Sequence, residues 1–159
     1  MIRIEPKAIA TFALRLLARV AFAVWFGGFT FYAAVVVPDL HESLGGMETG
    51  DISRRVAPFL YMLGLAALLL NGLVLIADRA ERSGWRGKAR LGLLAASALL
   101  LVVLVAMHWE MGARLDSGTG HDRFFSLHET YLTVFAVQWL ANLGLLALDS
   151  VSRNSRKDV

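Results

Sequence analysis

Histidine and carboxylate side chains gather at the ends of the long apolar stretches of this chain. His108 closes one stretch and is followed by Glu110, and His128 opens the next and is followed by Glu129. His41 lies just beyond the end of an earlier stretch. Neutral imidazoles with nearby carboxylates suit a divalent transition metal, and imidazoles from separate helices can hold a b-type haem. These five residues are therefore a candidate metal or haem site.

Other chemistries are limited by what the sequence lacks. The chain has no cysteine, which excludes a disulfide, a thiolate metal site, a cysteine-held iron–sulfur cluster and a covalent c-type haem. It also has no phosphate loop, no nucleophile elbow and no H-E-x-x-H motif, so no catalytic signature is present. The histidines have a second interpretation as ordinary residues of a membrane interface. Whether the chain is an enzyme stays open at this stage.

A polar stripe runs along the last apolar stretch, residues 128–149. Its members step by three and four alternately and so share one helix face: His128, Tyr131, Gln138, Asn142 and Asp149, with Phe135 and Leu145 filling the gaps. A polar face turned to lipid is unfavourable, so this face should point at other helices or at a water-filled cavity. The simpler interpretation is interhelical hydrogen bonding by Gln138 and Asn142, at about 0.6–2 kcal/mol each.

The elements that must position these residues are membrane helices. Hydrophobic residues make up 57% of the 159-residue chain, above the share of about 45–50% that is usual for soluble domains. The apolar runs are too long and unbroken for barrel strands of about 9–11 residues. We therefore expect an all-α integral membrane protein with a single domain and four spans, near residues 10–37, 59–77, 91–109 and 128–149.

Two prolines mark expected helix boundaries. The first apolar stretch is too long for a signal peptide, so we expect it to remain as a span that ends at Pro38. The segment DLHESLGGMETGDISRRVA that follows is polar and glycine-rich, which predicts a loop, with a short interfacial helix as an alternative. Pro58 is well placed to begin the second span, in which Asn71 lies on a weaker polar stripe.

Basic residues indicate how the spans are oriented. They are frequent before the first span, in the DRAERSGWRGKAR connection and in the VSRNSRKDV tail. By the positive-inside rule these segments are cytoplasmic. We therefore expect an up-down four-helix bundle with both termini in the cytoplasm and all four histidines on the outer side. The net charge of +3 is explained by this anchoring, so no nucleic-acid partner is needed.

Depth in the membrane predicts two further polar groupings. At a rise of about 1.5 Å per residue, Asn71 and Asn142 lie at a similar distance from the outer ends of their spans, and they are placed to bond across the bundle. Three charged residues come out level at the inner boundary and form a predicted inner charge cluster: Arg19, Asp78 and Asp149.

Three segments carry a resemblance to a known family: GGFTFYAAVVVPDL, RRVAPFLYMLG and RFFSLHETYLTVFAVQWLANLGL. Together they resemble the bacterial members of the transmembrane-protein-205-like family, a domain of unknown function. The resemblance covers nearly the whole chain and implies a compact four-span protein of the bacterial inner membrane, with no settled reaction. His41 and His108 lie outside its pattern. The residues that match it are Gly28, Phe31, Tyr32, Pro38, Phe124, His128 and Tyr131.

Two function hypotheses follow. In the first, His108 and His128, with His41 and a carboxylate, bind a metal ion or b-type haem on the outer face. In the second, the chain is a non-catalytic membrane component that oligomerises or joins a larger membrane complex. Small residues would form its contact surface: Gly27, Gly28, Gly64 and Ala67. A complete carrier is not expected, because no broken helix or inverted repeat is visible.

Overall fold

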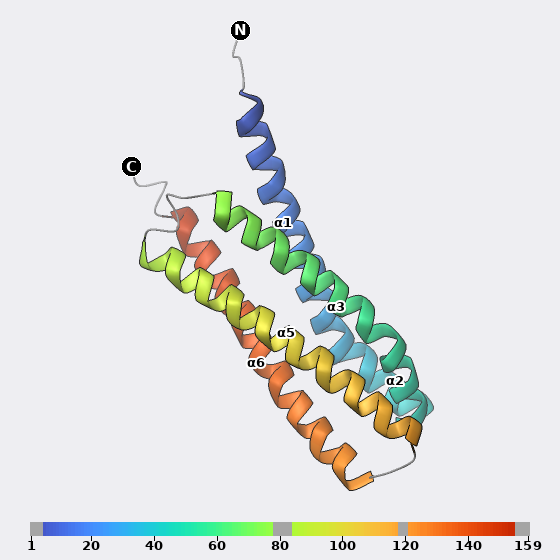
Figure 1. Cartoon of the computed structure of the whole chain (residues 1–159). Coiled ribbons are helices and arrows are strands. Elements are labelled where there is room, and N and C mark those ends of the chain that lie inside the picture. Colours follow the sequence, from blue (N-terminus) through green and yellow to red (C-terminus); the bar gives the residue numbers. More distant parts are fainter. Residues whose placement is uncertain (1–4, 78–83, 118–120, 155–159) are drawn as a thin grey trace.

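The structure is a computed structural model that describes residues 5–77, 84–117 and 121–154 (Figure 1). These residues form helices and contain no strand. The elements are α1 (Pro6–Phe31), the π-helical turn η1 (Tyr32–Val36), α2 (Val37–Leu44), α3 (Gly46–Ala77), α5 (Trp85–Ser117) and α6 (His121–Asn154).

Four segments of the described chain are long and apolar enough to cross a membrane: Ile9–Leu44, Gly46–Ala77, Trp85–Arg114 and Ser126–Asp149. The first of them comprises α1, η1 and α2, which follow one another without a break. Large apolar side chains such as Phe12, Phe59 and Met62 are about 70% exposed, as expected of side chains that face lipid. The prediction of an all-helical membrane protein with four candidate spans is confirmed.

Pro38 does not end the first helix, and that prediction was wrong. The chain widens into the π-helical turn η1 just before the proline, with the Val37 N–H bonded to the Tyr32 carbonyl. A π-helical turn shifts the hydrogen-bond pattern by one residue, and such turns occur where a helix must absorb an irregularity. The missing N–H of Pro38 is thereby accommodated, and the helix runs on to Leu44.

The predicted loop before Pro58 is also helical. A single residue, Gly45, separates α2 from α3, and its φ of 89° reverses the chain in a conformation that suits glycine. The Thr49 hydroxyl donates to the Gly45 carbonyl at 2.6 Å. Pro58 therefore lies inside α3. This part of the helix was not predicted, because residues 46–57 are polar and lack the apolar periodicity from which the helices were predicted.

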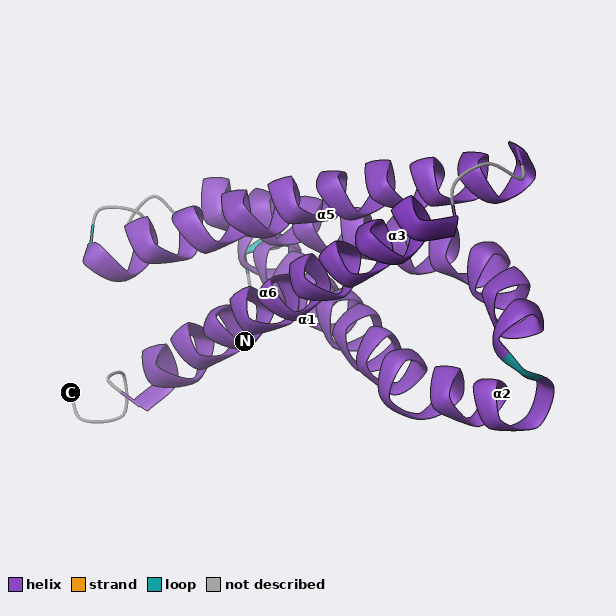
Figure 2. Cartoon of the chain, turned by 90° about the horizontal axis from the view of Figure 1, so that it is seen from below, coloured by secondary structure: helices purple, strands orange, loops and turns teal. Residues whose placement is uncertain are grey.

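The helices pack along seams whose residues step by three and four. α1 packs on α3, α3 on α5 and α5 on α6 (Figures 1 and 2). The seam of α1 contains Ala18, Phe22, Trp25 and Phe29, and the seam of α5 contains Leu94, Ser97, Leu101 and Leu104. Alternating steps of three and four are the pattern of coiled-coil packing. Side chains on these seams therefore form successive layers along the bundle.

The indole of Trp25 lies against Gly64. Trp25 is fully buried, and a Cβ built on Gly64 would lie 2.6 Å from its ring. Ala67, one turn along α3, is also fully buried. The prediction that Gly64 and Ala67 form part of an outer contact surface was wrong, because these small residues admit α1 inside the bundle. Gly27 and Gly28 differ, since a Cβ on either would meet nothing within 4 Å.

Aromatic rings join α1 to α6. The rings of Phe29 and Phe135 stack with centroids 4.2 Å apart, and those of Phe26 and Trp139 lie 5.8 Å apart. The Trp139 indole N–H donates to the Thr30 hydroxyl at 3.0 Å. Residues 26–30 of α1 are therefore level with residues 135–139 of α6.

Candidate functional site

Polar side chains inside the bundle lie in three layers. The first, here called the tyrosine layer, comprises Tyr61, Tyr131 and His108 from three different helices. The hydroxyls of Tyr61 and Tyr131 are 2.8 Å apart, and the His108 ring stands edge-on to Tyr61 at 5.5 Å. Next to this layer, the Tyr32 hydroxyl donates to Ser53 at 3.0 Å. These contacts join α3, α5 and α6, and they join η1 to α3.

His108 has a partner that explains its position. Pro58 has no N–H, so it leaves the carbonyl of Arg54, four residues earlier in α3, without its usual helical donor. The His108 side chain hydrogen-bonds the backbone of Arg54. This contact ties α5 to the irregular turn of α3, and it gives His108 a structural role.

The second, here called the amide layer, lies deeper and comprises Trp25, Ser97, Gln138 and Asn142, all with 0% exposure. The Ser97 hydroxyl donates to Oδ1 of Asn142 at 3.2 Å. Within the described part of the chain, no partner is found for four other atoms: Nε1 of Trp25, Nε2 and Oε1 of Gln138, and Nδ2 of Asn142. Buried polar atoms in membrane proteins are normally paired, so this layer is chemically incomplete as a set of protein contacts.

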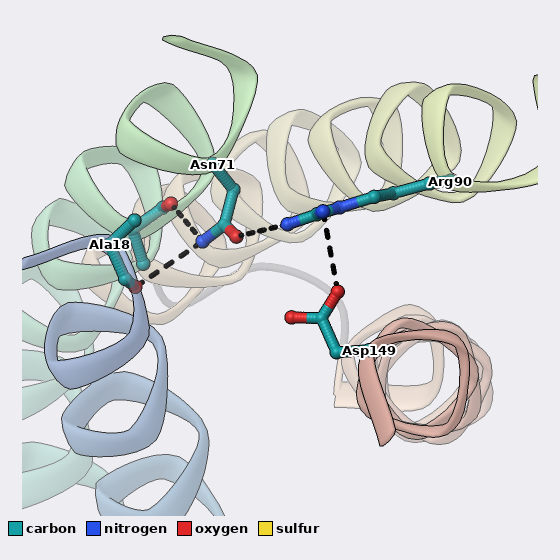
Figure 3. A network of polar contacts seen from close by, with 5 residues as sticks. Ala18, Asn71, Arg90 and Asp149 are labelled. Atoms are coloured by element: carbon teal, nitrogen blue, oxygen red, sulfur yellow. Dashed lines mark hydrogen bonds and ion pairs between the residues drawn. The ribbon is translucent and has the colours of Figure 1, made fainter. Parts of the chain in front are cut away.

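The third, here called the arginine layer, connects all four long helices (Figure 3). The Asn71 amide donates to the Ala18 carbonyl of α1 at 3.4 Å and to the Ala67 carbonyl of its own helix at 2.9 Å. Its Oδ1 accepts from Arg90 at 3.3 Å. Arg90 also forms an ion pair with Asp149 at 3.4 Å. A single chain of contacts thus runs from α1 through α3 and α5 to α6.

The candidate metal ligands do not gather. His41, His128, Glu110 and Glu129 are exposed, while His108 is half-buried beside Tyr61. Glu110 forms an ion pair with Arg114, one turn along α5. Among the residues that the structure describes, no three His, Asp or Glu side chains come together where they could hold a metal ion. The metal or haem hypothesis therefore has no support in the described residues.

Most of the polar stripe of α6 faces the interior, but His128 at its head is exposed. Gln138 and Asn142 are fully buried, Tyr131 bonds Tyr61, and Asn71 of α3 is 8% exposed. Asn71 and Asn142 lie in different layers and bond other residues. The two amides do not meet because a shared depth does not decide which side chains face each other: Asn71 bonds Ala18, Ala67 and Arg90, whereas Asn142 bonds Ser97.

One member of the predicted inner charge cluster, Asp149, belongs to the arginine layer. Asp149 pairs with Arg90 of α5, and Arg19 is exposed on α1. Asp78 lies outside the described residues. Sequence reasoning missed Arg90 because it counted this residue among the basic residues of a connecting loop. The seam of α5 contained the signal, since Arg90 continues the steps of three and four that run through Leu94 and Ser97.

One family model matches the chain, and its description reads "Domain of unknown function (DUF4149)". The match covers residues 20–114, more than half of the chain. The matched part includes Trp25, Gly64, Asn71 and Arg90, and it ends before α6, which supplies Gln138 and the other α6 members of the three layers. No curated protein and no solved structure matches the chain.

Proposed function

The chain belongs to the DUF4149 family, whose function is unknown, and we propose that it is a non-catalytic scaffold of the bacterial inner membrane. The arginine layer is the observation that carries this proposal. In this layer, Asn71 of α3 bonds Ala18 of α1 and Arg90 of α5, and Arg90 pairs with Asp149 of α6. Each of the four long helices therefore contributes one residue. A polar network of this kind specifies one arrangement of helices, because every alternative leaves a buried charge or amide unpaired. A fixed helical frame is what a scaffold requires.

The proposed frame is an up-down bundle with the N-terminus, the connection between α3 and α5, and the C-terminus in the cytoplasm. The supporting observation is the concentration of basic residues in these segments. The four long apolar segments of the described chain support the four-span arrangement. Lipid is the main partner of the outer surface, where Phe12, Phe59 and Met62 are exposed.

We propose a second copy of the chain as the partner of α1. Gly27 and Gly28 lie side by side in this helix, with open space at the position of each Cβ. Small residues on a lipid-facing helix permit close approach of another helix backbone, which is how many membrane helices associate. The expected result is a homodimer in which two α1 helices cross at these glycines.

The test replaces both glycines by leucine. Subunits of the parent and of Gly27→Leu/Gly28→Leu are counted by single-molecule photobleaching in liposomes at low protein density. We expect the dimerisation constant derived from the dimer fraction to fall at least about tenfold, which corresponds to roughly 1.4 kcal/mol of association free energy. Gly92→Leu is the matched control, because its Cβ also meets nothing within 4 Å but lies on α5. A monomeric parent, or an unchanged dimer fraction in the double variant, would contradict the proposal.

A further inference from the structure

We propose that the amide layer is an internal hydration site, in which water molecules bond Trp25, Gln138 and Asn142 in the middle of the bundle. The proposal starts from four buried polar atoms that find no partner among the described residues. They belong to three side chains with 0% exposure, so bulk solvent does not reach them directly. This inference does not depend on the scaffold role, because a bundle of any function would have to satisfy these atoms.

The atoms belong to one region of the core. Phe29 is level with Phe135 and Phe26 with Trp139, as their ring contacts show. Trp25 and Gln138 each precede one member of the second pair, and both are fully buried, so they lie at one level inside the bundle. Asn142 follows Gln138 by one turn, about 6 Å along α6. The unpartnered atoms of α1 and α6 thus belong to the same level of the core, with Trp25 Nε1 next to Gly64 of α3.

The Trp25 ring is not free to turn toward another partner. Gly64 leaves space for the indole, but a Cβ there would already lie 2.6 Å from it. On its own helix, Phe22 stands edge-on at 5.7 Å and Phe29 lies at 6.3 Å. The indole N–H is therefore fixed in direction and must be satisfied where it lies.

The chemistry of the layer indicates a neutral ligand with lone pairs. Trp25 offers one N–H donor, the two amides offer N–H donors, and Gln138 also offers a carbonyl acceptor. None of these side chains carries a formal charge, so nothing here compensates an ion. Buried water typically forms about three hydrogen bonds with protein groups that would otherwise be unpaired. Water supplies both the acceptors and the donor that this set requires.

Apolar side chains separate the layer from the tyrosine layer. Leu104 is fully buried and Leu101 is 5% exposed, and both lie on the α5 seam between Ser97 and His108. The Phe29–Phe135 stack lies at the same end of the layer. On this side the hydration site is therefore separated from the tyrosine layer.

The four tryptophans of the chain allow a direct test by NMR. The protein is labelled with ¹⁵N in the indole groups, placed in lipid nanodiscs, and examined for magnetisation transfer from water to each indole N–H. We expect a water signal at Trp25, assigned by its loss in Trp25→Phe. Trp139 is the dry reference, because its indole donates to Thr30. Trp85, which is 69% exposed at the first position of α5, shows that the transfer is detectable.

A variant then tests whether the water belongs to the amide layer. Gln138→Leu removes both unpartnered amide atoms of this side chain and should reduce the Trp25 water signal at least about threefold. The control is Val137→Leu, which lies on the exposed side of the same turn and should leave the signal unchanged. Circular dichroism checks that both variants fold, and Gln138→Met serves if the leucine variant does not. Absence of a water signal at Trp25 in the parent would overturn the proposal without any variant. A contact between Trp25 and lipid acyl protons would overturn it too, since lipid would then occupy the site.

Discussion

The indole ring of Trp25 occupies the place where a side chain on Gly64 would lie. This pair shows why a glycine inside a membrane helix can have a packing role: it lets a large ring from the neighbouring helix reach the helix surface. The ring also contacts Phe22 and Phe29 of its own helix. The position therefore has little capacity to adjust to even one added methyl group.

We predict that Gly64→Ala destabilises the protein. A Cβ at Gly64 would lie 2.6 Å from the Trp25 ring, so the two helices must separate or the ring must move. Overpacking of this kind costs about 1–3 kcal/mol, which outweighs the gain of up to about 1 kcal/mol from replacing glycine in a helix. Thermal unfolding in detergent micelles measures the net effect.

Gly72→Ala is the control for this prediction. It lies on the same helix, and its added Cβ would meet nothing within 4 Å. Only the helix-propensity term applies, so the variant should equal or exceed the parent in stability by up to about 1 kcal/mol. Equal effects of the two substitutions would show that Trp25 does not restrict position 64.

At the scale of elements, the structure depends on charges placed where two helices meet. Arg90 lies near the start of α5 and Asp149 near the end of α6, and their ion pair is largely buried, with side-chain exposures of 11% and 29%. The neutral amide of Asn71 accepts from the same guanidinium. Removing one partner leaves the other charge in a poorly solvated position, which is more harmful than losing both.

A double-mutant cycle tests this arrangement. We predict that Arg90→Met destabilises the bundle by roughly 1–3 kcal/mol, below the range of about 3–5 kcal/mol for fully buried pairs because Asp149 is partly exposed. Arg90→Met/Asp149→Leu should be more stable than the two single effects predict when added. Lys88→Met, an exposed residue of the same helix end, should change stability by less than about 0.5 kcal/mol. Strict additivity would mean that the ion pair contributes nothing.

The same elements mark how far sequence reasoning extends. The four apolar helices could be predicted, because composition and run length depend only on the local chain. The period of the last span placed Gln138 and Asn142 on one face, and both are buried. The pairing of Arg90 could not be predicted in this way, because it depends on contacts between distant residues. The π-helical turn before Pro38 could not be predicted either, because a proline after an apolar run usually marks the end of a helix. The histidines illustrate the same limit, since topology gives their level in the membrane but not the direction of each side chain.

For the whole molecule, we predict that both termini are cytoplasmic. The basic segments before α1, between α3 and α5, and after α6 are the motivation. A reporter fused after Val159 should be active only if it is a cytoplasmic reporter, and one inserted at Gly45 only if it is an external reporter. Activity of an external reporter at Val159 would show that the bundle has the opposite orientation in the membrane. It would also place the tyrosine layer near the cytoplasm and the arginine layer near the outer face.

The unbroken run of α3 from Gly46 through Pro58 has a consequence for what holds the molecule together. The helix has 32 residues and is therefore about 48 Å long, against a hydrocarbon core of about 30 Å. One part of the packed seam of α3 therefore lies in the lipid bilayer and the other part extends into water. Its polar end, residues 46–57, is stabilised as in a water-soluble protein, where the hydrophobic effect acts and urea weakens it. The remainder is stabilised as in lipid, by close packing and hydrogen bonds. The two ends of one helix therefore depend on different stabilising interactions.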